Sequence, residues 1–298
     1  MSVTYNIIQA DWGIGDIICS LYAVQGLAAK KTGSQINLYL RQHFGWAYLA
    51  DIPGLQIHQY DEKNPPVNAI LLYDANEDPH KFIKHTNSPK QYYSQRLGVT
   101  PQIPKLQNHI TSSSRIFGEK YIVFSPFASR INRTWEIQNW RLLAQKFQEI
   151  GYKVIALDSP HENKRCKPIG VEYFWGQTAE WTAQVCQHAE MIIGNDSGIA
   201  HLGGWLGKKT LVLMSQLLPA QFYDLTNNYF WVPKQHCTGC RFIPEYGYEE
   251  KCDYGCWVLQ SIRPQHIFDA AIDCLNETEV LSNEQFFESS FAQNSKTG

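Results

Sequence analysis

Residues 191–214 carry the strongest chemical signal in this chain, and their sequence is MIIGNDSGIAHLGGWLGKKTLVLM. The apolar residues 191–194 are typical of a buried parallel strand, and the polar turn after them opens a short helix. The first amides of such a helix have no partners within the helix and bind phosphate well. Asp196 and Ser197 add a carboxylate and a hydroxyl at the same place. Both residue types are also common helix N-caps, so a purely structural role for this pair stays open.

A second candidate loop, residues 125–135, has the sequence SPFASRINRTW and follows another predicted strand. It carries several hydroxyls, including that of Ser129, and two guanidinium groups, Arg130 and Arg133. Arginine binds phosphate oxygens in a bidentate manner. Open α/β sheets bind ligands at the carboxyl ends of their strands, so we expect this loop and the Asp196 turn at that edge of a sheet.

Two further loops hold carboxylates at the ends of predicted strands. Glu162 lies in DSPHEN, residues 158–163, and could accept hydrogen bonds from ribose hydroxyls, although a glutamate in a loop is usually just solvated. Asp16 ends the sequence GIGD at residues 13–16. A lone G-x-G is a weak signal, and an aspartate at the start of a helix is as often a cap as a functional group.

Four of the eight cysteines, Cys237, Cys240, Cys252 and Cys256, follow the pattern C-x2-C-x11-C-x3-C. The spacing within each pair is that of metal ligands. Two disulfides and four free thiols are the alternatives, and the absence of secretory features disfavours disulfides. We therefore predict a metal finger over residues 236–257 that holds zinc or iron. Four thiolates leave no open coordination position, so its role is expected to be structural.

Strands and helices alternate along the chain, which predicts an α/β fold with parallel sheets. Strands are expected at residues 3–9, 36–40, 69–73, 121–125, 153–157, 191–194 and 210–214, and helices at residues 17–31, 139–150, 179–188, 198–206 and 263–276. Residues 13–16 are expected to form a tight turn, and residues 74–90 show little periodicity. The pattern is interrupted over residues 108–118, which predicts a boundary between domains 1–115 and 116–298.

The composition excludes several classes of protein. The formal net charge of −2 over 298 residues does not suggest a nucleic-acid partner. No apolar run reaches the roughly 18 residues that are needed to span a membrane. The N-terminal sequence lacks the charged start and the cleavage site of a signal peptide. We therefore expect a cytoplasmic protein with reduced thiols.

Taken together, these loops resemble glycosyltransferase family 9, the ADP-heptose heptosyltransferases. Residues 195–207 are similar to the family pattern D-[ST]-G-x-x-H-L followed by small residues, and the matching positions are Asp196, Ser197, Gly198 and His201. RTWEIQNW at residues 133–140 resembles K-x-W-P-x-x-x-W, and Gly15-Asp16 resembles the G-D after the first strand. The resemblance covers most of residues 3–275.

The resemblance implies the GT-B fold, in which two Rossmann-like domains face a cleft. Domain 1–115 would bind the acceptor, and domain 116–298, which carries the cysteine finger, would bind the nucleotide sugar. The family's general base corresponds to Asp16, and its phosphate-binding lysine corresponds to Arg133. The implied donor-binding set is Ser129, Arg130, Arg133, Glu162, Asp196, Ser197, Gly198 and His201, of which Glu162 is matched only by its loop position.

The implied activity is inverting transfer of a sugar, with heptose from ADP-heptose favoured, to a hydroxyl of a glycan, a protein or a small molecule. No D-x-D motif is present, so no catalytic metal is expected. Arg133 replaces the family's lysine and keeps the positive charge, whereas the near-neutral net charge disfavours an anionic lipid acceptor.

One subgroup of the family, which heptosylates bacterial autotransporter proteins, has a four-cysteine iron site in a similar place. The finger at residues 236–257 resembles that site, and we expect it to protrude near the cleft or to form a contact in a homo-oligomer. Two other functions stay open: a sugar-nucleotide epimerase or hydrolase on the same fold, and a non-catalytic protein whose finger binds partners. A pure scaffold would have no need of Asp16, Arg133 and Asp196.

Overall fold

The computed structural model describes residues 3–9, 13–73, 88–128, 131–158, 170–217, 219, 228–233, 239–240 and 256–277. The chain forms two compact units. The first contains the described residues up to Ser114 together with Thr178–Gln184, and the second contains Arg115–Gln177 and the described residues from Val185 onward. Each unit is built around a parallel sheet, so the predicted α/β class with parallel sheets is confirmed.

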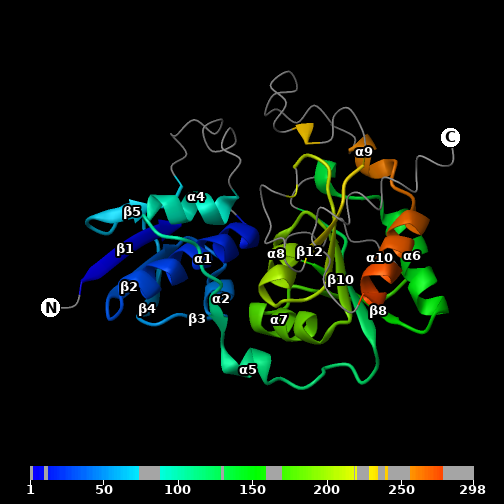
Figure 1. Ribbon diagram of the computed structural model, residues 1–298, viewed down its shortest axis with the longest axis horizontal. Coiled ribbons are helices and arrows are strands. Elements are labelled where there is room, and N and C mark those ends of the chain that lie inside the picture. The colour runs from blue at the N-terminus through cyan, green and yellow to red at the C-terminus, as the bar shows by residue number, and fades with distance from the viewer. Residues whose placement is uncertain are drawn as a thin grey trace. The chain divides into compact units, whose positions relative to one another are not determined.

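The sheet of the first unit has the strand order β4-β2-β1-β5, and every neighbouring pair in it is parallel (Figure 1). Its strands are β1 (Thr4–Gln9), β2 (Gln35–Leu40), β4 (Leu55–Gln59) and β5 (Ala69–Leu71). The chain adds strands outward from β1 on one side and then returns to β1's other side with β5. The strand order therefore reverses between β1 and β5, which is where open α/β sheets bind ligands.

The register of this sheet sorts its side chains by polarity. Ile7 pairs with Leu38, which pairs with Ile57 on the next strand. One residue earlier, Asn6 pairs with Asn37, and the Asn37 amide donates a 2.9 Å hydrogen bond to the Asn6 side chain. Because successive residues of a strand point to opposite faces, the sheet has one face with an aliphatic row and one with a polar row.

The helices of this unit are α1 (Ile14–Lys30), α2 (Phe44–Ala47), α4 (Pro89–Arg96) and α5 (Asn108–Thr111), and β3 (Ala50–Asp51) pairs with β6 (Lys105–Leu106). Helix α1 packs against α2 and α4. The tight turn predicted at residues 13–16 is wrong, because the helix already begins at Ile14. Gly13 is its N-cap, and the side chain of Asp16 accepts the Gly13 N–H, which stabilises the first helical turn.

The second unit has a six-stranded parallel sheet of order β12-β11-β10-β7-β8-β9 (Figure 1). Its strands are β7 (Tyr121–Ser125), β8 (Lys153–Asp158), β9 (Glu172–Trp175), β10 (Met191–Asn195), β11 (Thr210–Leu213) and β12 (Asn228–Trp231). In chain order this is 3-2-1-4-5-6, the strand order of a Rossmann fold. The order reverses between β7 and β10, whose carboxyl ends are Ser125 and Asn195.

The helices of the second unit are η1 (Ile131–Arg133), α6 (Ile137–Glu149), α8 (Gly198–Trp205), α9 (Trp257–Gln260) and α10 (Pro264–Asn276). Helix α7 (Ala179–His188) is divided between the units, since its residues up to Gln184 belong to the first. Helix α6 is amphipathic, and it packs against α10 with a buried stripe formed by Trp140, Leu143, Ala144 and Phe147. Trp135 and Trp140 are both fully buried in this core and meet edge to face, with ring centroids 5.2 Å apart. This packing anchors the chain directly after η1, the segment that presents Arg133.

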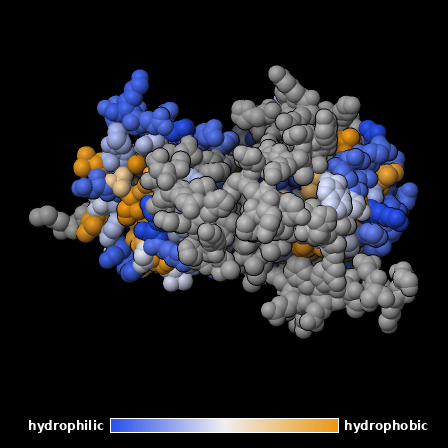
Figure 2. All heavy atoms as spheres, turned by 90° about the horizontal axis from the view of Figure 1, so that it is seen from above, coloured by the Kyte–Doolittle hydropathy of each residue, from blue (hydrophilic) through white to orange (hydrophobic). Residues whose placement is uncertain are grey.

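Exposed hydrophobic side chains are scattered over the described part of the chain. On the face shown in Figure 2, hydrophobic residues are interspersed with hydrophilic ones. Val67 and Ile103, exposed to 76% and 60%, belong to different loops. Single exposed hydrophobic residues of this kind are normal for protein surfaces. Among the described helices, none has both the length and the apolar character needed to span a membrane.

Candidate active site

The second unit places polar groups where its strand order reverses. The hydroxyl oxygens of Ser125, at the end of β7, and Ser197, just after β10, are 3.1 Å apart. Asn195 is fully buried, and its side chain donates a 2.6 Å hydrogen bond to the carbonyl of Pro126 and accepts one from the Trp135 amide. Asn195 therefore ties both ends of the loop after β7 to the end of β10. The two loops that the sequence placed at one edge of a sheet are joined here.

Arg133 and Asp196 form an ion pair across the same two loops. Nη1 of Arg133 lies 3.4 Å from Oδ2 of Asp196, and the side chains are exposed by only 18% and 6%. Charge-assisted hydrogen bonds are commonly about 2.7–2.9 Å long, so this pair is a loose one. A mostly buried carboxylate needs a cation nearby, and Arg133 provides it. An anion bound at this place would compete with Asp196 for the same guanidinium.

Helix α8 begins directly at this pair. Ser197 occupies its N-cap position in an extended conformation but makes no side-chain capping hydrogen bond, because its hydroxyl lies against Ser125. The first amides of a helix lack partners within the helix and carry partial positive charge, so the start of α8 at Gly198 suits an anion. His201 is half-buried one turn further along.

Two glycines let α8 lie directly on the sheet. A Cβ atom built on Gly203 would stand 2.2 Å from Thr210 Oγ1 and 3.0 Å from Ile192 Cδ1. One built on Gly204 would stand 2.9 Å from the side-chain nitrogen of Asn228. A larger side chain at either position would push the helix away from β10, β11 and β12. The glycines therefore help to hold the N-terminus of α8 beside the end of β10.

In the first unit, Asp16 stands at the start of α1, next to the reversal between β1 and β5. Its two carboxylate oxygens have different partners: Oδ2 accepts the Gly13 N–H, and Oδ1 accepts the hydroxyl of Tyr93, each at 3.2 Å. Asp16 is partly exposed, whereas Tyr93 is buried, with 1% of its surface accessible. Sequence reasoning missed Tyr93. Tyr93 lies on α4, whose first turn has a capping box formed by Ser88 and Gln91. Their S-x-x-Q spacing is the sequence signal by which this helix could have been predicted.

Among the described residues, the thiol of Cys19 and the phenol of Tyr93 interact with the Asp16 carboxylate. Burial and the nearby Asp16 carboxylate raise the pKa of the Cys19 thiol. Burial, followed by the charge of Asp16, raises the pKa of the Tyr93 phenol well above its ordinary value of 10.0, and the Gln9 side chain hydrogen-bonds to the same phenol. Tyr93 is therefore a protonated hydrogen-bond donor throughout the neutral pH range. The backbone N–H of Lys90 donates to the Cys19 sulfur, which brings the first turn of α4 against α1.

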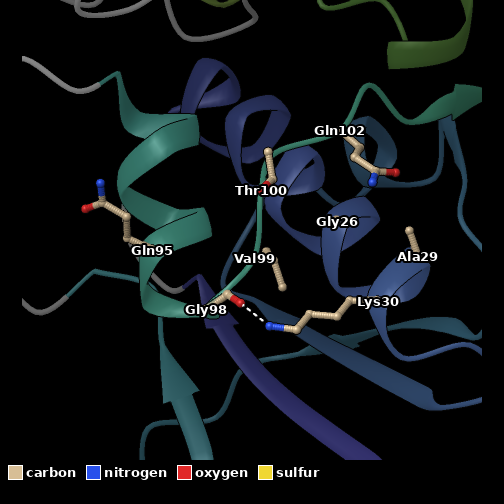
Figure 3. A pocket seen from close by; sticks show the side chains of 8 residues that line it. All are labelled: Gly26, Ala29, Lys30, Gln95, Gly98, Val99, Thr100 and Gln102. Carbon is tan, nitrogen blue, oxygen red and sulfur yellow. Dashed lines mark hydrogen bonds between the residues drawn. The ribbon is translucent and has the colours of Figure 1, made fainter.

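A pocket in the same unit lies away from Asp16, at the other end of α1 (Figure 3). Lys30 donates a 2.6 Å hydrogen bond to the Gly98 carbonyl there. A Cβ on Gly26 would lie 2.2 Å from the carbonyl oxygen of Thr100, so the chain after α4 packs tightly on the helix. Gly26 is ten positions beyond Asp16, a rise of about 15 Å along a helix. This pocket does not include the candidate base.

Several predicted site residues fall outside the described residues: Ser129, Arg130, Glu162, Cys237 and Cys252. Cys240 is partly exposed and follows Gly239, whose N–H donates a 2.7 Å hydrogen bond to Ser215 just beyond β11. Cys256 is buried and is the N-cap of α9. Within the described ranges no three His, Cys, Asp or Glu side chains gather as a metal would require. Because two of the four predicted ligands lie outside those ranges, the metal site stays a prediction.

Comparisons with known proteins identify the family. The sequence model of glycosyltransferase family 9 (heptosyltransferase) matches residues 80–241, more than half of the chain. The chain therefore belongs to glycosyltransferase family 9 and is a glycosyltransferase, as the motifs predicted. The comparison with curated proteins found no match.

Solved structures of heptosyltransferases share the fold. The iron-containing dodecameric heptosyltransferase TibC from enterotoxigenic E. coli H10407 is 16% identical, with a TM-score of 0.71 over 92% of this chain and 77% of TibC. A family 9 glycosyltransferase from Veillonella parvula DSM 2008 is 15% identical, with a TM-score of 0.65 over 92% and 98% of the two chains. E. coli heptosyltransferase WaaC with ADP is 15% identical, with a TM-score of 0.59 over 83% and 100%. These likenesses show a heptosyltransferase-like α/β fold.

Proposed function

We propose that this enzyme is an inverting glycosyltransferase that moves a heptose from ADP-heptose to an acceptor hydroxyl. The observation that carries the proposal is the site at the β7–β10 reversal, where the Arg133–Asp196 pair meets the start of α8. A cation and a helix N-terminus at one point suit the diphosphate of a nucleotide sugar. TibC has been crystallised with ADP-D-beta-D-heptose and WaaC with ADP, which supports the choice of donor.

The residues take the following roles in this proposal. Domain 116–298 binds the donor through Arg133, Asp196, the amides from Ser197 to Gly198, and His201. Ser129, Arg130 and Glu162 belong to the same donor-binding set through the family resemblance. Domain 1–115 binds the acceptor, which is a glycan, a protein or a small molecule, and supplies Asp16 as the general base.

The reaction is a single displacement. Asp16 takes the proton from the acceptor hydroxyl while that oxygen attacks the anomeric carbon. The bond between the anomeric carbon and the diphosphate oxygen breaks, and the nucleoside diphosphate leaves with the electron pair. Attack opposite the leaving group inverts the anomeric configuration. Arg133 and the α8 amides stabilise the negative charge that develops on the diphosphate.

We further propose a structural metal, zinc or iron, held by Cys237, Cys240, Cys252 and Cys256. Four thiolates are a fitting donor set for either metal, and the description of TibC as iron-containing supports the proposal. Its description as dodecameric supports a homo-oligomer here as well. A cytoplasmic location would keep these thiols reduced and able to bind the metal.

Product analysis tests the proposed reaction. The enzyme is incubated with a panel of nucleotide sugars that includes ADP-heptose, with and without candidate acceptors, and the products are identified by mass spectrometry and NMR. We expect a new glycosidic linkage of inverted configuration and nucleoside diphosphate in equal amounts. Equal turnover without any acceptor would instead show a hydrolase, and an altered nucleotide sugar would show an epimerase.

A further inference from the structure

We propose that Tyr93 is a positioning residue for Asp16. Three elements of the first unit, α1, α4 and β1, would together hold the Asp16 carboxylate in place. The inference rests on the proposed function, because it takes Asp16 to be the general base. The hydroxyl of Tyr93 would hold one carboxylate oxygen while α1 holds the other, leaving the carboxylate in a single orientation toward the acceptor.

The hydrogen bonds on Asp16 are complementary. Gly13 donates to Oδ2 and Tyr93 donates to Oδ1, each at 3.2 Å. Each carboxylate oxygen has two lone pairs, so an oxygen that accepts one of these bonds can also accept one from an acceptor hydroxyl. Donors on both oxygens prevent rotation of the carboxylate about its last bond. A helix cap by itself needs only the Gly13 contact, so the Tyr93 contact is additional to the capping role.

Tyr93 is itself held rigidly. Its ring is buried, and the side chain of Gln9, the last residue of β1, hydrogen-bonds to its phenol. Arg96, one turn further along α4, donates two hydrogen bonds to the carbonyl of Leu71, the last residue of β5, at 3.2 and 3.0 Å. Helix α4 is thus fastened across the carboxyl ends of β1 and β5. These are the two strands between which the order of the sheet reverses.

The neighbouring charges favour this arrangement. In the described part of the chain, the titratable groups with an interaction at this place are Cys19 on α1 and Lys90 and Tyr93 on α4. The Cys19 thiol and the Tyr93 phenol both have raised pKa values, so both stay protonated at neutral pH. Lys90 is the cation of this group of three. Tyr93 therefore donates its proton to the carboxylate rather than competing with it as an anion. A donated hydrogen bond favours the charged form of the carboxylate.

The first test is Tyr93→Phe in the full-length enzyme. The change removes one oxygen and keeps the buried ring. We expect kcat to fall about 10-fold, within the range for a hydrogen bond to a charged group, with the donor KM unchanged within about twofold. We also expect the acid side of the pH profile of kcat/KM to move to higher pH, because the carboxylate loses a donor to its charged form.

The matched control is Tyr121→Phe in the second unit. Tyr121 is also fully buried, and its hydroxyl donates a 2.7 Å hydrogen bond to the Val185 carbonyl. Both variants should lower the melting temperature, because each loses one buried hydrogen bond. The control should leave kcat and the pH profile unchanged. Equal kinetic effects of the two variants would reduce Tyr93 to a structural residue and overturn the proposal.

A double-mutant cycle separates this inference from the proposed function. If Tyr93 acts through Asp16, adding Tyr93→Phe to Asp16→Asn should not lower the residual rate further. Independent, multiplying losses would overturn the positioning role while leaving Asp16 as the base. If Asp16→Asn alone keeps full activity, the base assignment fails instead, whatever Tyr93 does.

Discussion

The guanidinium of Arg133 and the carboxylate of Asp196 lie 3.4 Å apart at the point where the strand order of the second sheet reverses. The two residues are 63 positions apart in the chain and come from different loops. Their pairing brings a cation to the start of α8, and each of them is mostly buried. This relationship makes the site a candidate for a diphosphate.

Replacing Arg133 by alanine should weaken binding of the nucleoside diphosphate by about 1.5–3 kcal/mol, the size expected for a hydrogen bond to a charged group. Calorimetry with ADP, UDP and GDP measures the change. Arg115→Ala is the matched control, because it removes an arginine whose 2.9 Å pair with Glu190 is more exposed. The alanine variant also loses the Arg133–Asp196 ion pair. Arg133→Lys, which keeps a positive charge at this position, is therefore a second variant and should bind with intermediate affinity. Unchanged affinity in the alanine variant would refute a phosphate role.

Gly203→Ala should destabilise the enzyme by about 1–3 kcal/mol, because a Cβ there overlaps Thr210 and pushes α8 off the sheet. Thermal unfolding with and without ADP measures the loss and whether nucleotide affinity declines with it. Gly118→Ala is the control, since a Cβ at that position has nothing within 4 Å. A Gly203 variant as stable as the parent would show that α8 can shift without cost.

Burial raises the pKa of the Cys186 thiol from 9.0 to about 12. The folded protein therefore holds this proton more tightly than the unfolded chain does. The stabilisation is complete below pH 9 and is lost as the pH rises toward about 12. We expect Cys186 to resist iodoacetamide at pH 8 and the melting temperature to fall in the alkaline range, with a smaller fall in Cys186→Ala. Rapid labelling of native Cys186, located by peptide mass spectrometry, would contradict the burial.

The protein as purified should contain about one atom of zinc or iron per chain. Elemental analysis without added metal measures this directly. Cys252→Ser should lose the metal and lower the melting temperature, because metal binding contributes the folding energy of a short polar loop. Cys166→Ser, outside the cluster, is the control. A protein with neither metal and four freely titrating thiols would exclude the finger.

The sequence was most informative where a local pattern decides the structure. The apolar run before Asn195 and the glycine-rich segment after it predicted β10 and α8 well, because a buried strand and a small-residue helix are read from neighbouring residues. Residues 13–16 were predicted to form a turn because two glycines in four residues are typical of turns. In the structure, Gly13 and the Asp16 carboxylate instead stabilise the start of a helix at Ile14.

Other features depend on contacts that no local pattern reveals. Helix α4 lacks a clear apolar stripe, so Tyr93 and its contact with Asp16, 77 positions away, were not anticipated. Strand β4 was missed because polar residues such as Gln56 and His58 alternate on its partly exposed surface. The loops of both candidate sites could be named from the sequence, but the Ser125–Ser197 contact follows only from the neighbouring positions of β7 and β10.

The central claim, that Asp16 is the general base of a sugar transfer, is tested most directly by the kinetics of Asp16→Asn. Asparagine keeps the shape of the side chain and a carbonyl oxygen for a hydrogen bond, but it cannot accept the proton. We predict that kcat with saturating donor falls about 10²–10⁴-fold while nucleotide binding, measured by calorimetry, stays within a few-fold. A variant that is folded, binds nucleotide and keeps near-full kcat would contradict the account and leave Asp16 as a helix cap.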